Sequence, residues 1–178
     1  MIRWSRYSLM VWLLVLVVQA GCPAKQQVKE PKAKASLYSM TLAQIDNVDY
    51  PLSTLRGKVV LVDFFASFCT PCLVIIPQLK KLYKNYKKQN FLVLGIALDR
   101  QMQILVPYIT YLRIDYPVLV ADENIHRGTS IFGKIRQIPK AVLFDRCGRV
   151  VGVYHGATNV DQMRRDVVLL VKKKEICR

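Results

Sequence analysis

The chain has 178 residues, a length that suits one domain with short additional segments. Hydrophobic residues make up 52% of it, which is enough for a single well-filled core, and no internal repeat points to a solenoid or propeller. The formal net charge of +15 favours anionic partners such as lipid headgroups or acidic proteins. No recognisable nucleic-acid-reading motif accompanies this charge, so the sequence predicts no nucleic-acid partner.

The first 21 residues have the pattern of an export signal. Arg3 and Arg6 precede an apolar run over residues 9–18, which is too short to span a bilayer comfortably, since about 20 residues are needed. The following Ala-Gly-Cys resembles the lipobox of bacterial lipoproteins, in which the cysteine is acylated, although Gln19 stands where that pattern prefers Leu. We expect a signal peptide over residues 1–21 and lipid attachment at Cys22. An uncleaved N-terminal anchor is the alternative.

Residues 22–36 are predicted to form a flexible, lipid-anchored tether. They include two prolines and four lysines, with no aromatic residue and no apolar periodicity. The positive charge suits a membrane surface with anionic headgroups. Each interpretation of the N-terminus exports the following domain to the periplasmic face of a bacterial cell envelope, where disulfides form and persist.

The domain itself is predicted to occupy residues 37–178. After a short strand over residues 37–42 and a polar turn, residues 59–65 form a β-branched, almost wholly apolar run that is typical of a central strand buried on both faces. Helical spacing of apolar residues follows over residues 72–88, and residues 91–98 predict a second buried strand. A helical crossover makes these two strands parallel.

Further helices and a strand are predicted next. A helical pattern over residues 101–112, interrupted by Pro107, is followed by a short strand over residues 117–120. Residues 124–132 are predicted to be helical.

The chain then predicts a hairpin and a closing helix. Residues 141–144 and 150–154 flank a turn and have the composition of paired strands. The closing helix spans residues 161–174, with Asn159 as its N-cap. Together these elements predict the α/β class, with a central mixed sheet flanked by helices.

Cys69 and Cys72 lie two residues apart at the predicted junction of a buried strand and a helix. Such a pair closes a small, reversible disulfide ring. At a helix N-terminus the first cysteine faces unpaired N–H groups and the positive end of the helix dipole, which favour the nucleophilic thiolate. Pro71 suits the first helical turn because its missing N–H would lack a partner there. The sequence therefore predicts a redox pair in which Cys69 attacks and Cys72 resolves.

A zinc site is the alternative interpretation of this cysteine spacing. Zinc needs two further ligands, and the available residues are isolated from one another in the sequence: Cys147, Cys177, His126 and His155. We therefore expect no metal and no other cofactor.

Three separated motifs resemble the thioredoxin family in the same order. Residues 59–72 (VVLVDFFASFCTPC) resemble its active-site segment, and with residues 52–58 they are closest to the exported TlpA/ResA-type branch. Residues 137–139 (Gln-Ile-Pro) are similar to the family's cis-proline loop, and residues 142–150 to the strand–turn–strand after it. The resemblance implies a thioredoxin fold, and the extra strand–helix stretch around residues 101–120 suits that branch.

The resemblance implies a protein thiol–disulfide oxidoreductase. Asp63, six residues before Cys69, matches the buried thioredoxin carboxylate that moves a proton to or from the inner cysteine, and burial would raise its pKa. A hydrogen-bonded structural acid is the alternative for Asp63. Substrate contacts are implied for five residues near the cysteines, with a cis bond before the last of them: Phe68, Thr70, Pro71, Ile138 and Pro139.

The implied partners are disulfides or thiols of exported proteins and a membrane electron carrier that re-reduces the enzyme.

Two other functions stay open, a thioredoxin-fold peroxidase and a non-catalytic surface module. Peroxiredoxins carry Thr three residues before their peroxidatic cysteine, where this chain has Ala66. Four departures from the family leave the partner and the electron direction open: Phe68 replaces Trp, Leu73 replaces Lys or Arg, Ile75 replaces Glu and Lys140 replaces Thr.

Cys147 and Cys177 are predicted to form a structural disulfide. The strand after Pro139 runs away from the redox pair, so its hairpin turn, which holds Cys147, lies at the far end of the sheet. The closing helix runs towards the same end and carries Cys177 there. Two free thiols are the alternative.

Overall fold

The computed structural model of the chain describes residues 36–173. The predicted signal peptide, the lipid attachment at Cys22, nearly all of the predicted tether and Cys177 lie outside the described residues.

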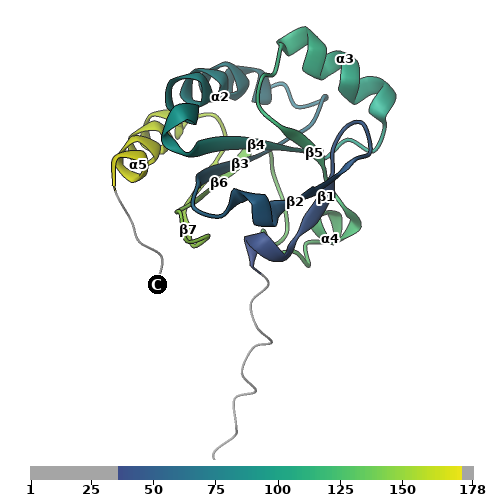
Figure 1. The fold of residues 1–178 in the computed structure, drawn as a ribbon. Helices are drawn as coiled ribbons and strands as arrows, with labels where there is room; N and C mark the ends of the chain where they lie inside the picture. Colours follow the sequence, from purple (N-terminus) through teal and green to yellow (C-terminus); the bar gives the residue numbers. More distant parts are fainter. Residues whose placement is uncertain (1–35, 174–178) are drawn as a thin grey trace, which may run out of the picture. The chain divides into compact units, whose positions relative to one another are not determined.

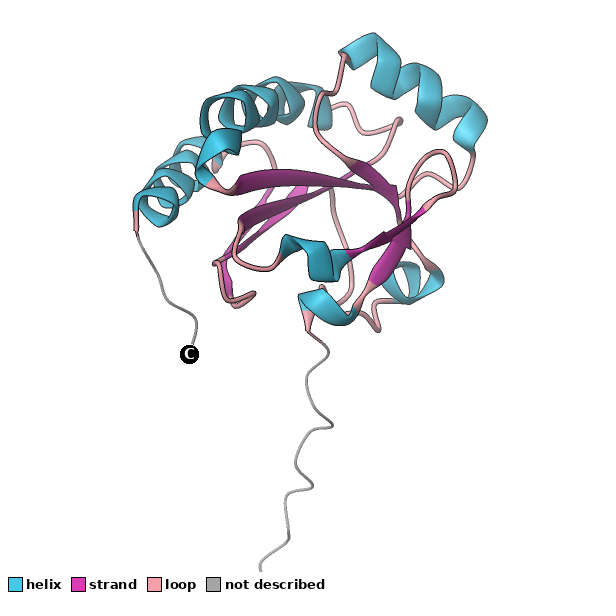
Figure 2. Ribbon diagram, viewed as in Figure 1, coloured by secondary structure: helices cyan, strands magenta, loops and turns pink. Residues whose placement is uncertain are grey.

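A five-stranded mixed sheet forms the centre of the domain (Figure 2). β3, β4 and β5 are parallel, β6 is antiparallel to β3, and β7 is antiparallel to β6, as expected for a hairpin. Every residue of β3 and β4 is buried, because other elements cover both faces of the sheet. The strands in spatial order are β5 (Val118–Val120), β4 (Phe91–Ala97), β3 (Val59–Phe65), β6 (Lys140–Phe144) and β7 (Val150–His155).

Three helices cover one face of this sheet: α2 (Cys72–Tyr86), α3 (Met102–Leu112) and α5 (Val160–Lys172) (Figure 1). The apolar residues of α2 recur at helical spacing and are buried against the sheet, so burial of one face stabilises the helix. α2 contains Pro77, whose nitrogen makes no backbone hydrogen bond, and continues into the short 3-10 helix η3 (Lys87–Gln89). The buried α2 side chains are Cys72, Ile75, Ile76, Leu79 and Leu82.

Shorter elements pack on the opposite face. They are η1 (Leu37–Ser39), β1 (Thr41–Ala43), β2 (Asp49–Pro51), η2 (Leu52–Leu55) and α4 (Glu123–Arg127). β1 and β2 form a small antiparallel sheet of their own. The side chains of Leu37, Leu52 and Leu55 are at most 1% exposed, so these short elements close the second core.

Two predicted elements differ from the structure. The strand expected over residues 37–42 begins only at Thr41, because residues 37–39 form η1 and Ser36 caps it by accepting a hydrogen bond from the Tyr38 N–H. The helix expected over residues 124–132 is α4 and ends at Arg127. Gly128 ends it in the left-handed region, with φ of 76°, where its N–H bonds to a carbonyl of the last turn.

One finer prediction was wrong and another was confirmed. α3 continues through Pro107, which was expected to interrupt it. Asn159 is the N-cap residue of α5, as predicted, although its side chain donates a hydrogen bond to the carbonyl of His155 and caps no helix N–H.

The turn between β6 and β7 lies at the end of the sheet away from Cys69 and Cys72, because β6 runs antiparallel to β3. Arg146 ties this turn to the end of α5, donating a hydrogen bond of 3.1 Å to the carbonyl of Val171. Its neighbour Cys147 is disulfide-bonded, and the predicted partner lies outside the described residues.

We predict that Cys177, six residues after Val171, is the partner of Cys147. Non-reducing peptide mapping of the exported protein should recover the two cysteines in one linked peptide, and recovery as separate alkylated peptides would reject the bridge. Because the bridge constrains the unfolded chain, Cys147→Ser should lower the free energy of unfolding by about 3–4 kcal/mol. Urea denaturation measures this loss.

Candidate active site

Cys69 and Cys72 are joined by a disulfide where β3 gives way to α2. Their Cα atoms are 5.3 Å apart, and the turn is fixed by backbone bonds from Cys69 N to Ala66 O and from Cys72 N to Cys69 O, both 3.0 Å. Cys72 is 1% exposed and Cys69 is 5% exposed, while Thr70 and Pro71 between them are exposed. Cys69 is therefore the more accessible cysteine of the pair, and its sulfur is the outer sulfur of the disulfide.

The first turn of α2 supplies a favourable field for a thiolate at Cys69. α2 begins at Cys72, and its first turn carries no acidic side chain that would oppose a negative charge. The first three N–H groups of α2 bond to the carbonyls of Cys69, Thr70 and Pro71 at 3.0–3.2 Å, so the field at the outer cysteine comes from the positive end of the helix dipole. When the disulfide is reduced, this field favours Cys69 as the thiolate nucleophile.

Asp63 lies on β3 beneath the cysteine pair. It alternates with Leu61 and Phe65, which belong to the same core cluster as Cys69 and Cys72, so its side chain faces the α2 side of the sheet. The residue is 1% exposed, and neither carboxylate oxygen has a hydrogen-bond partner among the described residues. Burial without compensation raises the pKa of Asp63 to about 7.

Small residues flank Asp63 on both sides of its strand. Gly95 of β4 and Ala141 of β6 are its register partners. A Cβ at Gly95 would be tight, because it would lie 3.0–3.3 Å from side-chain atoms of Phe65, Tyr116 and Val118. Neither register partner carries a polar side chain, so neither supplies the carboxyl group with a hydrogen bond.

A small cavity of about 10 Å³ connects Asp63 with the cis-proline loop. Its walls include Ile75, Pro139 and Ala141, and its size matches about one water molecule. The Ile138–Pro139 peptide bond is cis, and the Pro139 carbonyl accepts a hydrogen bond of 2.9 Å from Gly156. The structure thus brings Asp63 and Pro139 to one place, although they are 76 positions apart in the printed sequence.

Two further polar residues support the site, and sequence reasoning gave neither a role. Asp99 is buried and accepts three contacts from Ser67: two from its backbone N–H, at 3.0 and 3.2 Å, and one from its hydroxyl, at 2.5 Å. This pairing holds the start of the cysteine loop against the end of β4. The sequence offered one signal for this role, because Asp99 is an acid that directly follows a predicted buried strand.

Lys140 follows Pro139 and is buried on the opposite face of the sheet. Its register partner is Phe64, and its ammonium donates a 2.8 Å hydrogen bond to the carbonyl of Phe132. Burial lowers the pKa of Lys140. The contact ties the loop after α4 to the strand that follows the cis bond.

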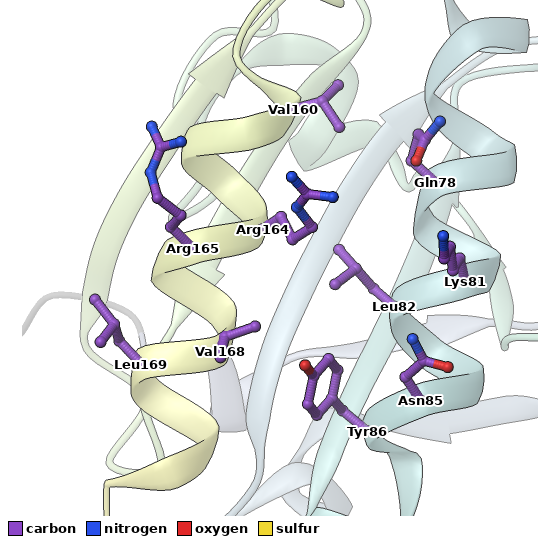
Figure 3. Close-up of a pocket in the computed structure, with 10 residues that line it drawn as sticks. All are labelled: Gln78, Lys81, Leu82, Asn85, Tyr86, Val160, Arg164, Arg165, Val168 and Leu169. Carbon is purple, nitrogen blue, oxygen red and sulfur yellow. The ribbon is translucent and has the colours of Figure 1, made fainter.

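The surface around the disulfide is apolar. Phe68 is 77% exposed, Val74 59% and Leu73 43%. A separate groove of about 420 Å³ lies between α2 and α5 and includes Leu82, Val168 and Leu169, with Arg164 and Arg165 from α5 (Figure 3). Neither cysteine lines that groove, so it is distinct from the candidate active site.

Within residues 36–173, no group of three or more histidine, cysteine or acidic side chains is placed to hold a metal ion. Over the same residues, none of the helices combines the length and the hydropathy needed to cross a bilayer.

The AhpC/TSA family matches residues 32–176. Two curated relatives are both named thiol-disulfide oxidoreductase ResA. The protein from Halalkalibacterium halodurans is 23% identical over 143 residues, covering 79% of this chain and 78% of the relative. The protein from Bacillus subtilis is 25% identical over 167 residues, covering 92% and 91%.

Solved structures with the same fold come from Chlorobium tepidum. A putative thiol:disulfide interchange protein DsbE superposes with a TM-score of 0.69 at 21% identity, covering 78% of this chain and 96% of that one. A thiol:disulfide interchange protein of the thioredoxin family gives a TM-score of 0.66 at 28% identity, covering 79% and 99%. The predicted thioredoxin fold is confirmed.

Proposed function

Because this chain belongs to the AhpC/TSA family, and its ResA relatives are named thiol-disulfide oxidoreductases, we propose that it reduces or exchanges disulfides through Cys69 and Cys72. The observation that carries the proposal is the disulfide at the N-terminus of α2, above a buried acid with a raised pKa.

The exchange begins with the reduced enzyme. The Cys69 thiolate attacks one sulfur of a substrate disulfide, so that one S–S bond breaks, a mixed disulfide forms and the second substrate sulfur leaves as a thiolate. The Cys72 thiolate then attacks the Cys69 sulfur and releases the first substrate sulfur. Two electrons pass from the enzyme to the substrate, and the enzyme is left with the Cys69–Cys72 disulfide seen in the structure.

Asp63 accepts the proton that Cys72 must lose before it attacks. With its pKa raised to about 7, the carboxyl group is divided between its two protonation states near neutral pH, which suits a group that takes up and returns a proton. The cavity between Asp63 and Pro139 offers space for about one water molecule beside the carboxyl group.

The contacts to the substrate are made by the residues around the outer sulfur. Phe68, Thr70 and Pro71 are exposed beside Cys69, and the backbone at Ile138–Pro139 lies next to the Asp63 cavity. Substrates are disulfides of exported proteins, and a membrane electron carrier re-reduces the enzyme by supplying two electrons and two protons.

The proposed location is the bacterial cell envelope. It is supported by the basic and apolar start of the chain, by the resemblance of residues 20–22 to a lipobox and by the lysine-rich tether. In this arrangement Cys22 carries the lipid, and the basic tether lies against anionic headgroups.

Peroxide reduction is the alternative enzymatic function, because peroxidases share the wider fold. Ala66 stands three residues before Cys69, where peroxiredoxins carry Thr, so the hydroxyl of that site is missing. A purely structural surface module would need neither the cysteine pair nor the buried acid. Peroxide consumption and insulin reduction, measured side by side, separate the three functions.

We predict that Cys69→Ser abolishes insulin reduction, because the remaining thiol at Cys72 is enclosed by the core. Cys72→Ser should still attack substrate disulfides through Cys69, but without the resolving thiol it should accumulate a mixed disulfide on Cys69, which mass spectrometry of the trapped complex identifies. Undiminished insulin reduction by a folded Cys69→Ser variant would show that Cys69 is not the attacking cysteine.

Replacing Asp63 tests the proton transfer. In the parent enzyme the resolving step should become faster as pH rises through about 7, because the carboxylate is the proton acceptor. Asp63→Asn should be about tenfold or more slower at pH 7 and should approach the parent above the usual thiol pKa, about 8.5, where solvent deprotonates Cys72. The control Asp49→Asn removes an exposed carboxylate and should keep the parent profile. Identical profiles for Asp63→Asn and the parent would make Asp63 a structural acid.

Replacing Cys22 tests the membrane attachment. Cys22→Ser should move the protein from the detergent phase to the aqueous phase in a detergent-partitioning experiment, because it removes the residue that would carry the lipid. A variant that stays in the detergent phase with its first 21 residues intact would show an uncleaved anchor instead.

A further inference from the structure

An open cleft of about 770 Å³ lies beside the cysteine loop, on the side of α3. Ser67 and Phe68 form one wall, directly before Cys69 in the chain, and the first turns of α3 with the preceding residues form the other. His126 of α4 completes the rim. The remaining lining residues are Leu98, Asp99, Arg100, Gln101, Ile104 and Tyr108.

Large apolar side chains shape this cleft and remain accessible. Phe68 is 77% exposed and Ile104 is 52% exposed, although both are large hydrophobic residues. Tyr108 is held in place by stacking on Phe65, with ring centroids 6.2 Å apart. Exposed apolar side chains that line a concavity beside a reactive group are typical of a binding site.

Tyr108 lines the cleft, but its hydroxyl is buried and so is not accessible to an occupant. The polar contact that suits a peptide backbone comes instead from Gln101, an exposed residue of the same lining.

The charges around the cleft are matched. The carboxylate of Asp99 accepts its contacts from Ser67, and Glu123 accepts hydrogen bonds from both Arg100 and Arg127, at 3.0–3.3 Å. The two acids thus offset the two arginines. The cleft therefore selects an occupant mainly by apolar contact, and a strongly charged side chain gains little there.

We propose that this cleft binds the residues flanking the target cysteine of a substrate polypeptide, and that it selects chains with an aromatic or large aliphatic side chain at those positions. The inference rests on the proposed function. Phe68 connects the two sites, because it lines the cleft and directly precedes Cys69. A substrate sulfur on Cys69 therefore leaves the neighbouring residues of its chain at the mouth of the cleft.

The test compares two peptides of equal length, each carrying one cysteine as a mixed disulfide with glutathione. One has Phe on both sides of the cysteine and the other has Ala. The parent should show kcat/KM several-fold higher for the Phe peptide, because burial of one aromatic ring favours binding. Ile104→Ala should reduce this preference at least threefold. The matched control Leu169→Ala truncates an exposed aliphatic residue of the α2–α5 groove and should preserve it (Figure 3).

A small disulfide, bis(2-hydroxyethyl) disulfide, separates this inference from the function on which it rests. If the parent reduces neither the small disulfide nor the peptides, the proposed function fails. If the parent reduces the small disulfide but treats the two peptides alike, or if Ile104→Ala keeps the full preference, the cleft is not the substrate site. If Leu169→Ala also removes the preference for the Phe peptide, the inference about the cleft is overturned as well.

Discussion

The burial of Asp63 at the centre of the sheet is the constraint on which the site depends. β3 must be apolar on both faces to occupy that position, and a charged carboxylate there has no hydrogen bond to offset its lost hydration. The protein tolerates the group by holding it protonated over a wider pH range, with a pKa of about 7. In the proposed mechanism the same raised pKa lets Asp63 take up the proton of Cys72, so the packing of β3 and the proposed proton transfer have one physical cause.

The same constraint dictates the neighbours of the acid. Gly95 and Ala141 keep side chains away from the carboxyl group on both sides, and Pro139 and Ile75 close the cavity beside it. A larger or polar residue at these positions would either fill the space or stabilise the carboxylate and lower its pKa. The small residues therefore serve the proposed proton transfer as well as the packing of the core.

Much of this arrangement could be predicted from the sequence, because the signals were local. The apolar run over residues 59–65, the helical spacing after Cys72 and the proline motif at Pro139 each indicated the element that the structure contains. Contacts between distant residues had no such signal. The burial of Lys140 depends on the pairing of its strand beside Phe64, and the loop that supplies the Phe132 carbonyl approaches Lys140 only in the fold.

Ile75 changes how the acid can titrate. It is 4% exposed and lines the cavity beside Asp63. The TlpA/ResA-type branch, which this chain resembles, often carries Glu at this position. Two carboxyl groups in one cavity would couple, and their protons would leave in two steps that belong to the pair. Among the described residues, no second carboxyl group lines this cavity. In the proposed mechanism proton transfer from Cys72 therefore depends on one carboxyl group with one pKa, and Ile75 simplifies the expected pH dependence of the cysteine pair without removing the proposed base.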